Sequence, residues 1–139
     1  MDAHLSSAGY ARAAKLADYI PGKIGVPGFL FATSRSKHSV RPIETIEPLS
    51  AKIGVSIDST YADQDYGALA SQLLHDQRFA DAMILVCWHH GNIPSMAHAL
   101  RAKAGDYPDP WDGQVFNQIL IFVYSGDDVP SVATLTEPF

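Results

Sequence analysis

Apolar runs of strand length recur along the chain. Residues 28–33 are a continuous apolar run, residues 83–88 give the strongest strand signal, and a strand predicted over 118–124 contains an apolar run at 119–124. All three fit strands that are buried in a sheet. Residues 55–58 and 132–136 are shorter and fit edge strands of a sheet. Polar segments separate all of these runs, so the pattern predicts several short strands.

Segments with apolar side chains at helical spacing lie between these runs. The spacing predicts helices over residues 10–19, 42–53, 66–77 and 93–104. Strands that alternate with helices in this way predict an α/β fold whose sheet is at least partly parallel.

Capping signals mark where two of the helices begin and end. Ser6 or Ser7 can accept a hydrogen bond from the free N–H groups of the first turn. The Pro21-Gly22 pair predicts the end of that helix. Pro42 fits the first turn of the second helix, and Gly54 fits its C-terminal cap.

The composition fits one folded domain. The chain has 139 residues, of which 47% are hydrophobic and 18% are charged, so we expect a single domain that spans residues 1–139. The net charge of −5 argues against a general nucleic-acid-binding role, because a phosphate backbone needs a basic face. One cysteine, Cys87, allows no internal disulfide.

No segment has the character of a membrane span or a signal peptide. The longest apolar run is far below the roughly 18 residues that cross a bilayer, and the first residues lack an apolar core. We therefore expect a cytoplasmic protein without a membrane partner.

Residues 34–41 form the first of two polar loops that follow long apolar runs. This loop carries Arg35, Lys37, His38 and Arg41 directly before a predicted helix start. Helix N-termini attract anions, and arginine matches the geometry of phosphate. The loop is therefore a candidate phosphate site, and the alternative is an ordinary solvated basic loop.

The second polar loop begins with His89 and His90 after the strongest predicted strand. Ligand sites in parallel sheets form just past the carboxyl ends of strands, so both loops are candidates for one pocket. A histidine there can bind phosphate or transfer protons, because its pKa lies near neutrality. Alternatively, one histidine caps backbone carbonyls and the other faces water.

Other chemistries find weaker support. A zinc site would need His89, His90 and His98, whose spacing matches no compact zinc pattern. Cys87 lies inside an apolar strand, where a thiolate is disfavoured. No glycine-rich phosphate loop is present, and no metal or organic cofactor is implied.

An acidic pair, Asp63 and Asp65, precedes the third predicted helix. Either side chain could supply a general acid, and helix capping is the alternative role for both.

Three segments together resemble the histidine phosphatase superfamily, which has the phosphoglycerate-mutase-like fold. Residues 5–13 (Leu-Ser-Ser-Ala-Gly-Tyr-Ala-Arg-Ala) are similar to its Leu-Ser/Thr-x-x-Gly-x-x-Arg-Ala first helix. Residues 41–45 (Arg-Pro-Ile-Glu-Thr), with Pro48, Leu49 and Gly54, are similar to its second-arginine helix. Residues 85–94 are similar to the strand and loop of its second catalytic histidine.

The resemblance implies a three-layer α/β sandwich and a hydrolase that transfers phosphate through a histidine. It implies that Arg41 binds the phosphate and that His89 is the second histidine, which fits the spacing to Ile93 and Pro94 better than His90 does. Asp65 is the candidate acid, with Asp63 behind it. The remaining phosphate-binding candidates are Arg35, Lys37, His38 and His90.

The family's Arg-His-Gly motif, at the end of its first strand, has no counterpart in the printed sequence. His4 is not flanked by Arg and Gly, so the nucleophile is not assigned to it. We expect an N-terminally incomplete domain, with three explanations open. The chain is a truncated or wrongly started phosphatase, a degenerate homologue that binds a phosphorylated ligand, or a protein that completes its sheet through another chain.

The expected partner is a phosphorylated small molecule or inorganic phosphate. The resemblance favours a phosphomonoesterase that is inactive or weak in this form. The alternative function is a non-catalytic phosphate-binding or self-associating module. Because a missing strand leaves unpaired edges, a homo-oligomer that completes the sheet is also expected.

Overall fold

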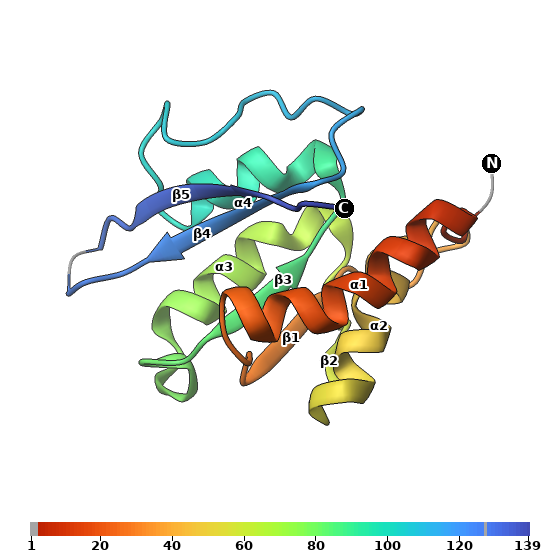
Figure 1. Ribbon diagram of the computed structural model, residues 1–139. Coiled ribbons are helices and arrows are strands. Elements are labelled where there is room, and N and C mark those ends of the chain that lie inside the picture. The colour runs from red at the N-terminus through yellow and green to blue at the C-terminus, as the bar shows by residue number, and fades with distance from the viewer. Residues whose placement is uncertain (1–2, 127) are drawn as a thin grey trace.

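Two small sheets form the centre of the molecule. The computed structural model describes residues 3–126 and 128–139. One sheet is parallel, with the order β2 (Ile57–Asp58), β1 (Phe29–Ala32) and β3 (Ile84–Cys87) (Figure 1). The other is an antiparallel pair of β4 (Gln118–Val123) and β5 (Ser131–Thr136). The mixed α/β character and the parallel sheet agree with the prediction.

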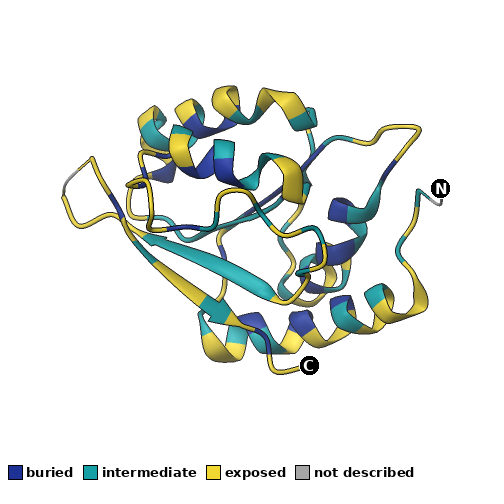
Figure 2. Cartoon of the chain, turned by 90° about the horizontal axis from the view of Figure 1, so that it is seen from above, coloured by how far each residue is buried: buried dark blue, intermediate teal, exposed yellow. Residues whose placement is uncertain are grey.

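Helices cover two faces of the parallel sheet. The α1 helix (Ser7–Lys23) and α2 (Arg41–Ile53) pack on one face, where they form a shared apolar cluster with β1. The α3 helix (Tyr66–His75) and α4 (Ile93–Ala99) pack on the other face. Figure 2 shows buried positions concentrated on the inward sides of these helices. Three short 3-10 helices span Asp63–Asp65, Gln77–Phe79 and His90–Asn92.

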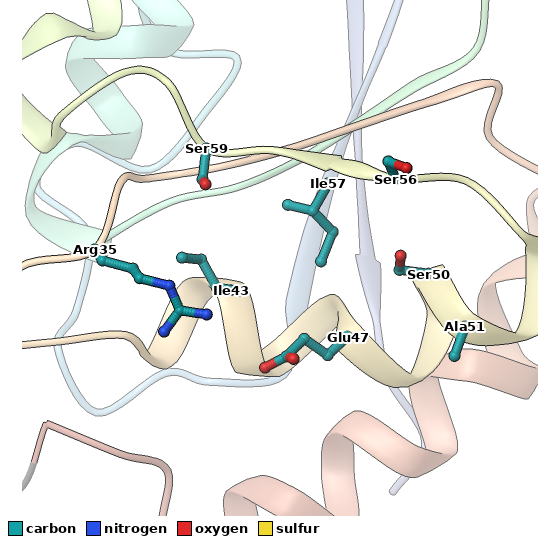
Figure 3. A pocket seen from close by; sticks show the side chains of 8 residues that line it. All are labelled: Arg35, Ile43, Glu47, Ser50, Ala51, Ser56, Ile57 and Ser59. Carbon is teal, nitrogen blue, oxygen red and sulfur yellow. The ribbon is translucent and has the colours of Figure 1, made fainter.

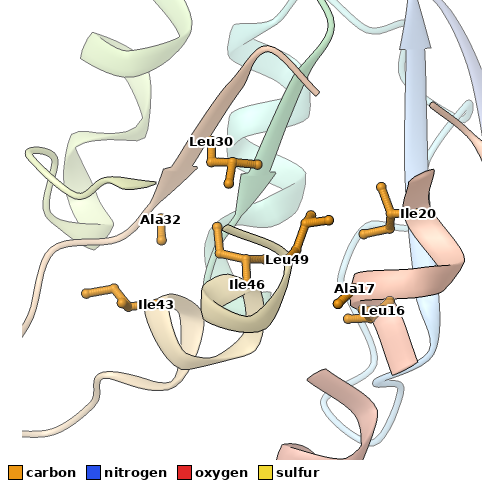
Figure 4. Packing of buried hydrophobic residues seen from close by; sticks show 8 residues of the cluster. All are labelled: Leu16, Ala17, Ile20, Leu30, Ala32, Ile43, Ile46 and Leu49. Atoms are coloured by element: carbon orange, nitrogen blue, oxygen red, sulfur yellow. The ribbon is translucent and has the colours of Figure 1, made fainter. Parts of the chain in front are cut away.

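The first apolar cluster explains why α1 and α2 fold as helices. Leu16, Ala17 and Ile20 of α1 share one helical face, and Figure 4 shows them directed towards the α2 side chains of the same cluster. Ile46 and Leu49 occupy the matching face of α2, and Leu49 is fully buried. Helical spacing of apolar residues therefore gives both helices a common core.

Three of the predicted helix ends match the structure. Ser6 is the N-cap of α1 and accepts a hydrogen bond from the Gly9 N–H at 3.1 Å. Pro42 lies in the first turn of α2. Gly54 ends α2 with φ of 71°, a left-handed conformation that glycine adopts without strain.

Two other predicted helix ends are wrong. The α1 helix continues through the Pro21-Gly22 pair to Lys23, because burial of Ile20 favours the last turn, and the Ile24 and Gly25 N–H groups both donate to the Ile20 carbonyl. The α4 helix ends at Ala99 rather than 104, since Arg101 adopts a left-handed φ of 70°.

The β4 strand differs from the prediction for residues 118–124. It was expected to be buried in a sheet, but its apolar residues are only half-buried and Val123 is 50% exposed. No ladder joins β4 to the parallel sheet anywhere in the described residues. The structure therefore has a separate antiparallel pair where the sequence suggests a buried sheet strand.

A buried ion pair ties the end of the antiparallel pair to α1. Arg12 donates from Nε and Nη2 to the two carboxylate oxygens of Glu137, each at 2.8 Å, and the Glu137 side chain is fully buried. Phe139 packs edge-on against Tyr19 of the same helix. The segment after β5 is thus held to the first helical layer by side chains.

No helix within the described ranges is both long and apolar enough to cross a membrane.

Candidate functional site

A cleft of about 450 Å³ lies where the loops after β1 and β3 meet. It combines cationic, hydroxyl, imidazole and acidic side chains from three segments of the chain. The lining residues are Ser34, Arg35, Ser36, His38, Ser39, Arg41, Ala62, Asp63, Gln64 and His89. The structure therefore brings the two polar loops that the sequence singled out around one cleft.

Serine hydroxyls shape the loop that leads into α2. Ser36 Oγ accepts from the backbone N–H groups of His38 and Ser39, at 3.2 and 3.1 Å. The buried Ser39 in turn accepts from the Arg41 N–H at 3.2 Å. These bonds fix the path of the loop, and Arg41 begins the helix at the cleft, where the dipole of α2 favours an anion.

The segment with Asp63 is anchored to the end of β3. The Trp88 indole Nε1 donates to the Asp63 carbonyl at 3.1 Å, and Trp88 itself is buried. The Asn92 side-chain amide donates to the same carbonyl at 3.4 Å. Residues on both sides of His89 therefore hold Asp63 at the cleft.

His89 is half-buried, and its surroundings disfavour the charged ring. Burial lowers the pKa of His89 below its usual value, and the nearby charges of Arg41 and His90 lower it further. The Asp63 carboxylate acts in the opposite direction. The imidazole is thus mainly neutral at pH 7.

Two buried side-chain oxygen atoms have no hydrogen-bond partner within the described residues. One is Oδ1 of Asp63, which lines the cleft. The other is Oγ1 of Thr33, which directly follows β1 and is 1% exposed. Unsatisfied buried oxygens are costly, so each of these two atoms lowers the stability of the fold.

Not every predicted site residue reaches the cleft. Arg35, His38, Arg41 and His89 line it, whereas Lys37 and Asp65 are exposed and do not. Asp63 is the acidic side chain that lines the cleft, whereas the candidate acid Asp65 does not line it, because the short 3-10 helix at 63–65 turns successive side chains to different sides. The choice of the acid stays a prediction.

His90 also lies away from the cleft. It is exposed, and its ring packs against Gly113. A Cβ atom added to this glycine would lie 3.3 Å from Nε2 of His90. Trp111 in the same loop donates to the Val115 carbonyl, so this loop is fixed by its own contacts. Of the two histidines, His89 therefore lines the cleft and His90 does not; which of them contacts a phosphate stays a prediction.

His4 contacts the first turn of α2 and is not among the residues that line the cleft. Its Nδ1 is 2.8 Å from Glu44 Oε2, and the Leu5 N–H and Tyr10 hydroxyl also donate to Glu44. Burial acts to raise the pKa of Glu44, but these hydrogen bonds outweigh it and hold the pKa below its usual value. Glu44, which the sequence did not single out, anchors His4, Leu5 and Tyr10 to α2.

A second cleft of about 460 Å³ shares Arg35 with the first. It runs between α2 and β2, and Figure 3 shows Arg35, Glu47 and Ser59 around it. Sequence reasoning missed it, because its serines come from segments without a recognisable motif.

Metal and thiol chemistry have no site in the part of the chain that is described. No group of three or more His, Cys, Asp or Glu side chains there could hold a metal ion. Burial raises the pKa of the Cys87 thiol to about 11, with Arg12 and Thr45 opposing the shift. A thiol of this kind is a poor nucleophile at neutral pH.

Comparison with known proteins gives no family assignment. No protein-family model matches the chain, and no curated protein matches it either.

Proposed function

We propose that this protein binds a phosphate group, free or as a monoester, in the cleft between Arg41 and His89. The observation that carries the proposal is the convergence of a helix-starting arginine, a second arginine and a half-buried neutral histidine on one cleft. Arginine offers paired donors to phosphate oxygens, and the dipole at a helix start favours an anion. In a chain of net charge −5, this local set of cations favours an anionic ligand.

His89 adds a pH-dependent contact. As a neutral ring it donates one hydrogen bond, and with an anion beside it the charged form becomes favourable. Asp63 is the acidic group at the cleft and is the candidate acid for the bridging oxygen of an ester.

We propose that the fold is the phosphoglycerate-mutase-like sandwich of histidine phosphatases. The resemblance of residues 5–13, 41–45 and 85–94 supports this, and so does the cleft that two of these segments form. Because the Arg-His-Gly motif is not among the printed residues, we expect binding with little or no turnover. Phosphoryl transfer through an enzyme-bound intermediate requires the nucleophile that this motif supplies in the family.

Calorimetric titration with inorganic phosphate, and with an aryl phosphate, tests the proposal. We expect one site in the wild type, and a loss of affinity of roughly tenfold or more in Arg41→Ala and in His89→Ala. Lys103→Ala removes the same unit of charge from an exposed position outside the cleft and should bind like the wild type. Equal affinity in all four proteins would overturn the proposal.

Release of the aryl alcohol in the same samples separates binding from catalysis. Turnover that disappears in Arg41→Ala and His89→Ala would establish a phosphatase. Turnover that survives both substitutions would place the chemistry outside this cleft.

A further inference from the structure

The two clefts have one side chain in common, that of Arg35. Arg35 lies in the loop between β1 and α2, and the first cleft extends from there to Arg41 and His89. The second cleft extends from the same residue along α2 to Ser50. A ligand that Arg35 holds by its phosphate group therefore has the second cleft beside it for the rest of the molecule.

The second cleft combines hydroxyl groups with apolar side chains. One wall is a face of α2, whose lining residues recur at helical spacing, and the other is β2 with the residues beside it. Figure 3 shows the Ile57 side chain between those of Ser56 and Ser59. The lining residues are Arg35, Ile43, Glu47, Ser50, Ala51, Ser56, Ile57 and Ser59. A sugar ring has the matching chemistry, because it carries hydroxyl groups around apolar C–H faces.

Two groups on the α2 wall accept hydrogen bonds from a ligand. The Ser50 hydroxyl donates its proton to the Val55 carbonyl, so its oxygen has only lone pairs left to offer. The exposed Glu47 carboxylate accepts hydrogen bonds and donates none. Within the described residues, no ion pair joins Glu47 to another side chain. This wall therefore favours a ligand with hydrogen-bond donors, and the charge of Glu47 favours a cationic one.

Binding of phosphate changes the charge balance of the second cleft. Among the described residues that line it, Arg35 and Glu47 are the two charged ones, with opposite signs. A phosphate group in the first cleft would engage the Arg35 guanidinium through paired hydrogen bonds. Glu47 is then the charge that remains beside the second cleft. A ligand that is negative at its phosphate end and positive at its other end matches both clefts.

The length of such a ligand follows from the helix. Glu47 lies six residues after Arg41 on α2, which is a rise of about 9 Å along the helix axis. A phosphate and an amino group on opposite sides of one sugar ring span a comparable length. The clefts, of about 450 and 460 Å³, are each in the size range of small-molecule sites.

We propose that the two clefts together bind the phosphate ester of an amino sugar, with its phosphate in the first cleft and its ammonium group at Glu47. This inference rests on the proposed function, because Arg41 and His89 hold the phosphate end. The ring would lie against Ile57, with a hydroxyl donating to Ser50. Glu47 is then a specificity-determining residue, and Arg35 links the two halves of the site.

Calorimetric titration of the full chain near pH 7 tests the proposal with two probes, glucosamine 6-phosphate and glucose 6-phosphate. The probes differ in one position, which carries an ammonium group in the first and a hydroxyl in the second. Inorganic phosphate and free glucosamine report on the two ends separately. Glu47→Gln removes the charge and keeps the shape of the side chain. The matched control Asp106→Asn makes the same change at an exposed position outside both clefts.

The wild type and Asp106→Asn should bind glucosamine 6-phosphate roughly fivefold or more tightly than glucose 6-phosphate, because the ammonium adds a charge-assisted hydrogen bond to Glu47. In Glu47→Gln this preference should disappear, while the affinity for inorganic phosphate should equal that of the wild type. Free glucosamine should bind far more weakly than its phosphate ester, since it leaves Arg41 and His89 without a ligand.

The results that contradict this inference differ from those that contradict the proposed function. Equal affinity of the wild type for the two sugar phosphates, or a preference that survives in Glu47→Gln, would overturn the inference and leave phosphate binding in place. Free glucosamine that binds as tightly as its ester would also overturn it, because one ligand would then not use both clefts. Failure of inorganic phosphate and both esters to bind would overturn the proposed function and this inference with it.

Discussion

The strands β1 and β3 are neighbours with similar sequences and different surroundings. Leu30 of β1 pairs in register with Leu85 of β3, yet Leu30 is 1% exposed and Leu85 is half-buried. The difference is the second edge, since β1 is paired on both sides and β3 is paired only with β1 in the described residues. Apolar composition makes a strand suitable for burial, but a neighbour on each side completes the burial.

Truncation of the paired leucines measures this difference directly. Leu30→Ala should lower the free energy of unfolding by about 3–4 kcal/mol, as for a fully buried leucine, and Leu85→Ala by about half as much. Denaturant unfolding of both variants provides the values. Equal losses in the free energy of unfolding would show that β3 is as well packed as β1, which would contradict the difference in burial.

Removal of the Glu137 charge should weaken the attachment of the antiparallel pair. In Glu137→Gln, the partly buried Arg12 loses its carboxylate, and we expect a loss of about 3 kcal/mol of stability. Glu47→Gln, at an exposed carboxylate of α2, should change stability by less than about 0.5 kcal/mol.

Amide hydrogen exchange shows which part of the structure Glu137→Gln destabilises. Because the Arg12–Glu137 pair ties the segment after β5 to α1, the amides of β4 and β5 should lose protection before those of β1. Uniform loss over both sheets would contradict this role of the ion pair.

Thiol reactivity compares the same two strands. The pKa of Cys87 is raised to about 11 by burial, so alkylation at pH 8 should be roughly a hundredfold slower in the folded than in the unfolded chain. The rate should rise with pH up to about 11 as the thiolate forms. Ala32 is the register partner of Cys87, so the double variant Ala32→Cys, Cys87→Ser should react more slowly still. A faster reaction at position 32 would contradict the difference in burial.

The loops after these strands meet at the cleft, where a smaller effect is expected. The Asp63 carboxylate opposes the lowering of the His89 pKa, so Asp63→Asn should lower that pKa further, by a few tenths of a unit or more. Asp65→Asn, at an exposed position outside the cleft, is the matched control. NMR titration of the His89 ring measures its pKa in both variants. Equal pKa values in the two variants would show that the Asp63 carboxylate does not act on His89.

His89 also gives stability a pH dependence of known sign. Since its folded pKa lies below the unfolded value of about 6.5, the unfolded state binds the proton first, and stability falls as the pH drops through this range. In His89→Gln this part of the pH dependence should be absent.

Much of the fold could be predicted because local patterns agree with the final packing. The apolar runs at 28–33 and 83–88 became β1 and β3, and Ile46 and Leu49 mark the buried face of α2. The end of α1 could not be predicted, since burial of Ile20 outweighs the local effect of Pro21. The separation of β4 from the parallel sheet could not be predicted either, because strand order depends on contacts between distant segments.

The sequence predicted which loops form the candidate site, but not every side chain in them that lines the cleft. Arg41 and His89 were found because helix starts and strand ends are places where polar side chains converge. Asp63 was ranked behind Asp65, since only the turn geometry and the hydrogen bonds from Trp88 and Asn92 decide which carboxylate faces the cleft. The role of Glu44 depends on contacts with His4 and Tyr10, about 35–40 residues earlier in the sequence, which no local pattern reveals.

Direct observation of His89 during phosphate addition tests the central claim, that the cleft binds phosphate through Arg41 and His89. In an NMR titration of the labelled chain near pH 7, we predict saturable shifts of the His89 ring and the Arg41 amide, together with a rise in the His89 pKa. The same titration of Arg41→Ala should show shifts that are much weaker. Shifts spread over exposed lysines, with His89 and Arg41 unmoved, would contradict the account.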